Sequence, residues 1–155
     1  MSRCGKLLLA GLMLAGASGC SRAASPAGAP PAGFEAEIER TFDRSARDWN
    51  AGDLEGFMSD YARDSTTSYV SGGRVRYGYD QIRDNYASRF APGASRDSLR
   101  FENLTVRPLG AAHALVTARF ILHRDGRTTA SGPFSVIMER RAEGWKILHD
   151  HTSSD

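Results

Sequence analysis

The pattern of hydrophobic and polar positions changes once along this chain, from a helical period to a period of two. Early in the chain, large apolar residues recur at helical spacing with Glu, Arg and Asp residues between them: Phe34, Ile38, Phe42 and Trp49. This pattern predicts an amphipathic helix that ends at Asn50-Ala51-Gly52. Gly52 fits the left-handed residue past a helix end, so we expect the chain to turn sharply there.

Two more helices and a hairpin are expected before the pattern changes. Asp53 can cap a second helix, with an apolar set of Leu54, Phe57, Met58 and Tyr61. Residues 65–71 and 74–77 have extended patterns on either side of Gly72-Gly73, which predicts a short hairpin. Pro92-Gly93 stops a third helix, which is marked by Ile82, Tyr86 and Phe90.

From residue 99 onward, apolar and polar residues alternate. The alternation predicts four strands, over residues 99–109, 112–123, 128–141 and 145–152, with glycine-containing turns between them. Helices first and long antiparallel strands after them indicate an α+β domain. A long twisted sheet that wraps a few helices forms a cone with a cavity at its open end, and such cavities are the usual ligand sites.

The last strand contains the densest group of titratable side chains. Simple alternation places Trp145 and Ile147 on the same face as His149 and His151. It places a second set on the opposite face: Lys146, Leu148, Asp150 and Thr152.

Three roles remain open for the histidine pair. His149 and His151 could act as general acid and base, or form hydrogen bonds within the sheet or at a subunit interface. They could also bind a metal, but that needs a third protein ligand, for which His113 or His123 would have to serve. The ligand set is incomplete, so we assign no metal site.

Residues 1–33 differ from the rest in composition. A short basic region and an apolar run over residues 7–17 precede Ala17-Ser18-Gly19-Cys20, which resembles a bacterial lipoprotein signal. We expect a signal peptide over residues 1–19, lipidation of Cys20, a flexible Ala/Pro/Gly linker over residues 20–33, and one domain over residues 34–155. The protein would then face the periplasm, anchored to the outer or inner membrane of the cell envelope. An ordinary secretory signal cut at the same site is the alternative.

Charge and cysteine content agree with that expectation. The chain has 20 Lys and Arg against 18 Asp and Glu, and residues 1–19 hold two of the basic side chains and none of the acidic ones. The remaining chain is therefore neutral, and without a Lys/Arg run it has no electrostatic footprint for nucleic acid. After removal of the signal peptide, Cys20 is the only thiol, so an intramolecular disulfide is excluded.

Several short motifs together resemble a known family. They are residues 49–54 (Trp-Asn-Ala-Gly-Asp-Leu), Tyr61, Asp64, Gly78, residues 144–147 (Gly-Trp-Lys-Ile) and residues 149–153 (His-Asp-His-Thr-Ser). In this order they resemble the nuclear transport factor 2-like superfamily, and within it the SnoaL-like domains of unknown function. The resemblance covers residues 34–153. It implies a cystatin-like roll, with three N-terminal helices packed on a long curved antiparallel sheet, and a homodimer formed through the sheet.

The same resemblance suggests residues for a ligand pocket. Ketosteroid isomerase, on this fold, uses an aspartate base with a tyrosine and a protonated aspartate in an apolar cavity. Here the aromatic residues on elements that should line a cavity are Trp49, Tyr61, Tyr69 and Tyr86, and the candidate carboxylates are Asp64 and Asp150. The alternative is that the tyrosines only pack the core and that Asp64 begins a loop.

Arg119 is the candidate anion-binding residue. It shares a strand face with Leu115 and Ile121, where a guanidinium needs a partner. The last strand resembles that of the calcium/calmodulin-dependent kinase II association domain, in which an arginine on the corresponding strand lines an anion pocket. A salt bridge from Arg119 to Glu102 or Glu139 is the alternative.

Three classes of function follow from these observations. The first is binding of a small organic molecule, for example a carboxylate. The second is catalysis of isomerase, dehydratase or hydrolase type, with proton transfer by pocket Asp, His and Tyr residues. The third is an oligomerisation module without a ligand. No motif present requires a cofactor.

Overall fold

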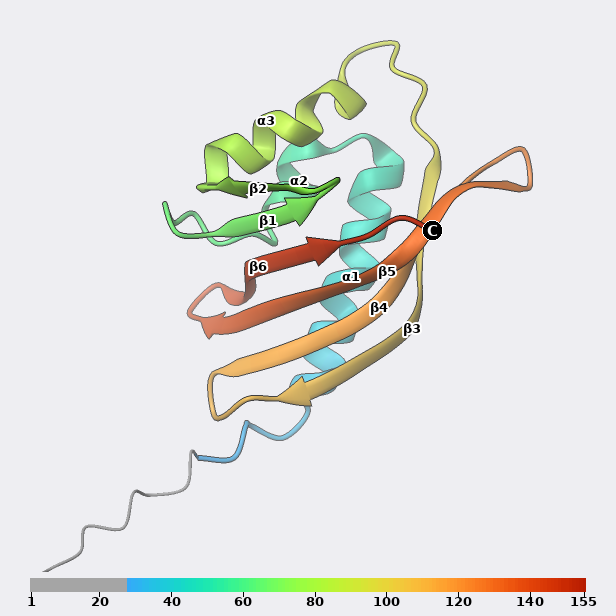
Figure 1. Ribbon diagram of the computed structural model, residues 1–155. Coiled ribbons are helices and arrows are strands. Elements are labelled where there is room, and N and C mark those ends of the chain that lie inside the picture. The colour runs from blue at the N-terminus through green and yellow to red at the C-terminus, as the bar shows by residue number, and fades with distance from the viewer. Residues whose placement is uncertain (1–27) are drawn as a thin grey trace, which may run out of the picture.

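The computed structural model describes residues 28–155, in which three helices and six strands form one α+β domain (Figure 1). The elements are α1 (Phe34–Ala51), α2 (Leu54–Met58), β1 (Ser68–Ser71), β2 (Arg74–Tyr77), α3 (Tyr79–Phe90), β3 (Ser98–Pro108), β4 (His113–Arg124), β5 (Arg127–Arg141) and β6 (Gly144–Thr152). The predicted class and order of elements are confirmed. The expected signal peptide and Cys20 lie outside the described residues.

The corner between α1 and α2 forms as the sequence predicts. Gly52 takes a left-handed conformation with φ 81°, and its N–H donates to the carbonyl oxygens of Asp48 and Trp49. The Asp53 carboxylate accepts a hydrogen bond from the Gly56 N–H at 2.8 Å and caps α2. The expectation that Tyr61 belongs to α2 is wrong, because α2 ends at Met58.

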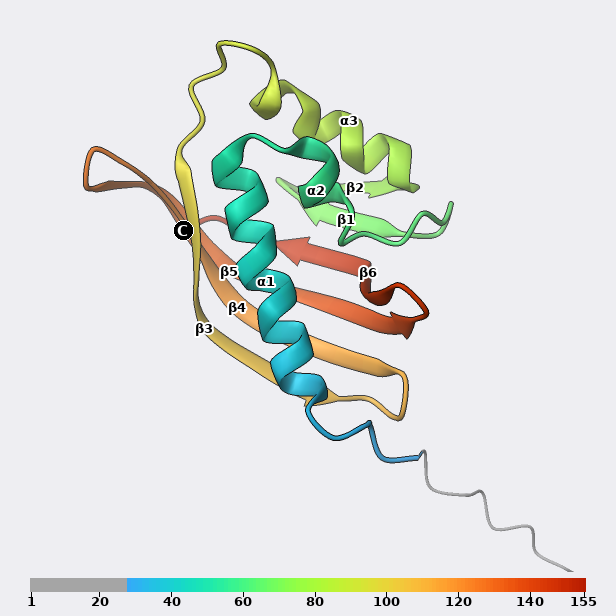
Figure 2. The same cartoon turned by 180° about the vertical axis from the view of Figure 1, so that it is seen from behind.

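The sheet has the strand order β2-β1-β6-β5-β4-β3. Strands β3 to β6 are antiparallel neighbours, as predicted, but β1 pairs with β6 in parallel. Helix α1 lies across one face of the sheet and α3 lies above the β1–β2 hairpin (Figure 2). Among residues 28–155, no helix is long and apolar enough to cross a membrane.

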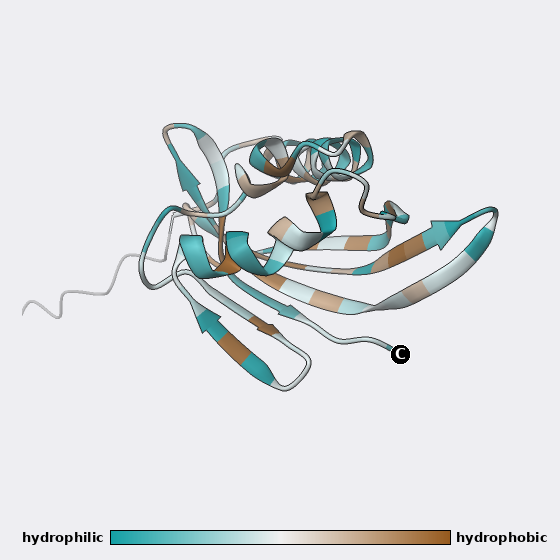
Figure 3. Cartoon of the chain, turned by 90° about the horizontal axis from the view of Figure 1, so that it is seen from above, coloured by the Kyte–Doolittle hydropathy of each residue, from teal (hydrophilic) through white to brown (hydrophobic). Residues whose placement is uncertain are grey.

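The core lies between the helices and the inner face of the sheet. Hydrophobic and hydrophilic residues alternate along the strands (Figure 3), so each strand supplies every second side chain to the core. The largest fully buried apolar side chains come from α1, α2, α3, β4 and β5: Ile38, Met58, Ile82, Val116, Val136 and Met138. Because these residues come from both layers, burial of the core joins the helices to the sheet.

A β-bulge in β6 changes the face on which the later side chains lie. Ile147 pairs with Met138 and His149 pairs with Ile137, so Leu148 is the extra residue. Trp145 and Ile147 point inward before the bulge, whereas Asp150 and Thr152 point inward after it. The prediction that His149 and His151 share a face with Trp145 is therefore wrong, because one extra residue reverses the alternation.

The segment between α2 and β1 is attached to the start of β6. The Ile147 N–H donates to the Asp60 carbonyl oxygen at 2.7 Å, and the Ala62 N–H donates to the Ile147 carbonyl oxygen at 2.9 Å. Tyr61 thereby forms a parallel bridge with Ile147. This pairing holds Tyr61 beside Ile147 of β6, the residue directly before the bulge at Leu148.

Candidate functional site

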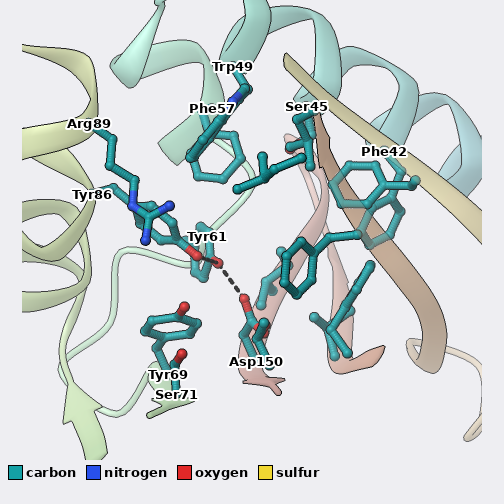
Figure 4. Close-up of a pocket in the computed structure, with 18 of the residues that line it drawn as sticks. Phe42, Ser45, Trp49, Phe57, Tyr61, Tyr69, Ser71, Tyr86, Arg89 and Asp150 are labelled. Carbon is teal, nitrogen blue, oxygen red and sulfur yellow. Dashed lines mark hydrogen bonds between the residues drawn. The ribbon is translucent and has the colours of Figure 1, made fainter. Parts of the chain in front are cut away.

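A cavity of about 170 Å³ lies between the helices and the inner face of the sheet (Figure 4). Most of its wall is apolar. Three tyrosines contribute to the wall and are described below. The other aromatic side chains of the wall come from α1, α2, β3, β4 and β5: Phe42, Trp49, Phe57, Phe101, Phe120 and Phe134. Among the described residues of the wall, only Asp150 and Arg89 carry a charge at physiological pH.

Asp150 is the buried carboxyl group of the cavity. It is 5% exposed, and the Tyr61 hydroxyl donates to its Oδ2 at 2.6 Å. The Thr152 hydroxyl donates to Oδ1 at 2.9 Å. Burial raises the pKa of Asp150 to about 6, while the two hydrogen bonds and the nearby His151 act in the opposite direction. The group is therefore mostly ionised at neutral pH, but its pKa lies close to that pH.

Three tyrosine side chains gather around this carboxyl group. The Tyr61 and Tyr86 hydroxyl oxygens are 3.4 Å apart, and the rings of Tyr69 and Tyr86 have centroids 5.5 Å apart. Burial is the main cause that raises the pKa of both Tyr61 and Tyr86 well above the ordinary value. These phenols remain protonated at neutral pH, so they can serve as hydrogen-bond donors.

An aromatic cluster holds one wall of the cavity in place. The rings of Trp49 and Phe57 have centroids 5.3 Å apart, and those of Phe57 and Tyr86 are 5.0 Å apart, both close to edge-to-face. The Trp49 indole N–H donates to the Asp97 carbonyl oxygen at 2.8 Å. Because the indole is hydrogen-bonded on one side and packed on the other, this wall is pre-organised for a flat apolar group.

The arrangement is suited to hydrogen bonding and to proton transfer. A carboxylate has about four acceptor positions, and Asp150 uses two of them within the protein. The remaining positions can accept a hydrogen bond or a proton from a molecule in the cavity. A carboxyl group with a pKa near neutrality is a better base than an ordinary aspartate, and neutral tyrosines can donate to an oxygen that gains negative charge.

The structure brings five of the residues singled out in the sequence to one cavity: Trp49, Tyr61, Tyr69, Tyr86 and Asp150. The two histidines lie elsewhere. The His149 Nδ1 atom is 2.8 Å from the Ser68 hydroxyl on the neighbouring strand, and His151 is exposed. Neither lines the cavity, because the bulge at Leu148 directs both to the outer face.

Asp64 and Arg119 also lie outside the cavity. Asp64 forms an ion pair of 2.5 Å with Arg141, and the hydrogen bond from Arg141 lowers the pKa of Asp64. Arg119 lies on the outer face of β4 and pairs with Asp155. The prediction that Arg119 lines the pocket is therefore wrong. The alternative prediction, a salt bridge to Glu102 or Glu139, is wrong as well. Within residues 28–155, no three His, Cys, Asp or Glu side chains are grouped so that they could hold a metal ion.

Sequence reasoning missed Arg89 as a cavity residue, and it also missed the phenylalanines of the wall: Phe42, Phe57, Phe101, Phe120 and Phe134. Arg89 lies three residues after Tyr86 on α3, a spacing that places two side chains on the same side of a helix. The helical period therefore places Arg89 on the same side of α3 as Tyr86, but its place at the opening depends on how α3 packs on the sheet. Phe57 was assigned to the core and contributes to the cavity wall as well.

A curved sheet wrapped around helices, with an aromatic cavity and a buried carboxyl group, defines a protein of the NTF2-like, or cystatin-like, class. The family model described as "SnoaL-like domain" matches residues 38–154, and the chain belongs to this family. The resemblance expected from the sequence motifs is thus confirmed.

Solved structures agree on the fold. An NTF2-like protein of unknown function from Shewanella oneidensis MR-1 shares 27% sequence identity with this chain and superposes with a TM-score of 0.68. The alignment covers 76% of this chain and 97% of the Shewanella chain. A protein of unknown function with a cystatin-like fold from Nostoc punctiforme has 13% identity and a TM-score of 0.68, covering 81% and 94%. A candidate dehydratase of the NTF2-like family from Streptomyces avermitilis has 19% identity and a TM-score of 0.66, covering 81% and 98%. No functionally curated protein matches this chain.

Proposed function

We propose that this domain binds a small organic molecule, about one ring in size, in the cavity beneath α1 and α3. The observation that supports the proposal best is the buried Asp150 carboxyl group, which faces an otherwise apolar aromatic wall. Burial of such a group is unfavourable unless it has polar partners. The volume fits the proposal, because a cavity of about 150 Å³ holds benzene and this one measures about 170 Å³.

Filling the cavity tests the binding proposal. Ala130 lines the cavity from β5, so Ala130→Trp places an indole in the ligand space. We expect ligand-detected NMR on the full chain to show phenol and benzamide binding to the wild type, with at least about tenfold weaker binding to Ala130→Trp. Thr128→Trp is the matched control, since Thr128 is exposed on the same strand and lies outside the cavity wall. Equal binding to all three proteins would place the molecules elsewhere and contradict the proposal.

Proton-transfer catalysis is the second candidate function. Its support is the raised pKa of Asp150, about 6, in contact with the Tyr61 hydroxyl. In such a reaction Asp150 would remove a proton from the substrate, and Tyr86 or Tyr69 would donate a hydrogen bond to the oxygen that gains charge. Isomerisation, dehydration and hydrolysis all contain steps of this kind. The Streptomyces avermitilis relative is a candidate for one of them, dehydration.

The proposal extends to the location and assembly of the protein. Support for export and for lipidation of Cys20 comes from the apolar run over residues 7–17 and the small residues before Cys20. We expect native mass spectrometry of the full-length protein in detergent to detect a homodimer with acyl mass on Cys20, and Cys20→Ser to remove that mass. A cleaved protein with an unmodified Cys20 would contradict lipid anchoring. Large assemblies without a bound molecule would favour the oligomerisation module.

A further inference from the structure

Arg89 reaches from α3 toward the cavity without an acidic partner. Its side chain lines the cavity (Figure 4), and among residues 28–155 it forms no ion pair and no side-chain hydrogen bond. Its guanidinium carbon lies 6.0 Å from the centre of the Trp49 ring, where a cation and the ring face attract one another. By contrast, Arg83 on the same helix pairs with Glu55 at 2.6 Å.

We propose that Arg89 binds the carboxylate of the ligand, so that the natural ligand is a small aromatic or alicyclic carboxylic acid. This inference rests on the proposed binding function, because it specifies the chemistry of the molecule held in the same cavity. A guanidinium presents a planar set of N–H donors that matches the geometry of a carboxylate.

The two ionisable groups of the cavity give the ligand an orientation. Arg89 is exposed and marks the opening together with Ser154, whereas Asp150 is 5% exposed at the inner end. A ligand carboxylate is attracted to Arg89 and repelled by the ionised Asp150, so the carboxylate lies at the opening. The ring then lies against Trp49, and the group that exchanges a hydrogen bond or a proton faces Asp150.

Other groups at the opening favour an anion as well. Ser71 and Ser154 add hydroxyl donors to the cavity wall. The opening thus combines positive charge with hydrogen-bond donors. Because Arg89 is exposed to solvent, its contact with the ligand carboxylate contributes modestly to affinity.

The test compares acids with amides of the same shape. Benzoate, benzamide, cinnamate and cinnamamide are titrated into the full-length protein at pH 7.5, with affinities from ligand-detected NMR. We expect each acid to bind roughly five- to tenfold more tightly than its amide, with a smaller difference at high salt. Arg89→Gln should lower the affinity for the acids to that for the amides. Arg83→Gln, on the same helix but outside the cavity, should keep the preference.

The failure of this inference can be distinguished from the failure of the binding proposal. Equal affinities for acid and amide, with binding lost in Ala130→Trp, would overturn the role of Arg89 and leave the cavity as a site for neutral molecules. A preference for acids that persists in Arg89→Gln would also overturn it. If none of the four molecules binds the wild type, the binding proposal and the inference both fail.

Discussion

Replacing Asp150 with Asn is expected to abolish proton abstraction in the cavity, lowering its rate by at least about 100-fold. A general probe is 5-nitrobenzisoxazole, a flat aromatic carbon acid that reacts in one step. The base takes the ring C–H proton, the electron pair of that bond forms a nitrile as the N–O bond breaks, and the oxygen leaves as a coloured phenolate. Asp150 is the one buried carboxyl group in the described cavity wall, so Asn at this position removes the base and retains the shape.

The pH dependence of the same reaction identifies the base. Only the carboxylate form of Asp150 can accept the proton, and burial raises its pKa to about 6. The wild-type rate should therefore increase about tenfold per pH unit below that pKa and become constant above about pH 7. Thr152→Val removes a hydrogen bond that lowers the pKa of Asp150, so the midpoint should move to higher pH.

Two controls separate catalysis from folding. Asp64→Asn should leave the rate unchanged, because Asp64 pairs with Arg141 outside the cavity. Asp150→Asn should not lower the free energy of unfolding at pH 7.5. The folded-state pKa of Asp150, about 6, lies above the ordinary value of 3.8 for an aspartate. Its contribution to stability therefore decreases as the pH rises through about 4 to 6, and Asn removes that penalty. A full rate in Asp150→Asn, or a lost rate in Asp64→Asn, would contradict the assignment.

Replacing Arg44 with Met is expected to lower the free energy of unfolding by about 2–3 kcal/mol at pH 7.5, equal to roughly 10 °C in Tm. Arg44 of α1 pairs with Asp60, which is 1% exposed and whose Oδ2 has no hydrogen-bond partner in the described structure. Removing the guanidinium leaves a buried carboxylate without its counter-charge. The expected loss is below that of a fully buried pair, because the Arg44 side chain is 44% exposed and solvent screens the interaction.

The effect of Arg44→Met should depend on pH. Burial raises the pKa of Asp60 to about 6, and both the charge and the hydrogen bond of Arg44 lower it, so the pKa rises further in the variant. At pH 4.5, Asp60 is neutral in the folded state of either protein, and we expect a loss below about 1 kcal/mol. The loss should grow as the pH passes 6. Chemical denaturation at the two pH values measures this difference.

Matched variants show whether charge is responsible. Arg47 is an exposed arginine on the same helix and forms no ion pair among the described residues. Arg47→Met should therefore change the free energy of unfolding by less than about 0.5 kcal/mol. Asp60→Asn combined with Arg44→Met should restore most of the loss, because no buried charge remains. An equal loss at pH 4.5 and 7.5 would instead assign the effect to packing of the Arg44 side chain.

This ion pair also supports the candidate site. Asp60 precedes Tyr61, and the backbone pairing of this segment with Ile147 places the Tyr61 hydroxyl 2.6 Å from Asp150. A change in the Asp60 environment can therefore move the phenol that holds the carboxyl group of the cavity. We expect the pKa of Asp150, read from the pH profile of the probe reaction, to shift in Arg44→Met as well.

Local periodicity was sufficient for the order of the elements and for four aromatic residues of the cavity wall. The spacing of Phe34, Ile38, Phe42 and Trp49 identified α1, and alternation from residue 99 identified the four long strands. Trp49, Tyr61, Tyr69 and Tyr86 were selected because aromatic residues on such elements face the interior, and all four line the cavity. Each of these inferences concerns residues that are close in sequence, where side-chain direction follows from the repeat of a single element.

The ionisable residues of the site could not be assigned in that way. The bulge at Leu148 depends on how β6 pairs with β5, and this pairing decided that Asp150, not His149 or His151, enters the cavity. The partner of Arg119 is Asp155, a residue far away in sequence that reaches it only after the chain folds.

The sequence by itself therefore determined the α+β class, the order of the elements, the family and four aromatic residues of the cavity wall, because each follows from local patterns or from short motifs. Only the tertiary structure decided which carboxyl group is buried at the cavity, that Arg89 marks its opening, and that Asp64 is engaged in an ion pair. The physical reason is that strand register, burial and charge partners are set by contacts between distant segments. A shift of one residue in that register exchanges the two faces of a strand.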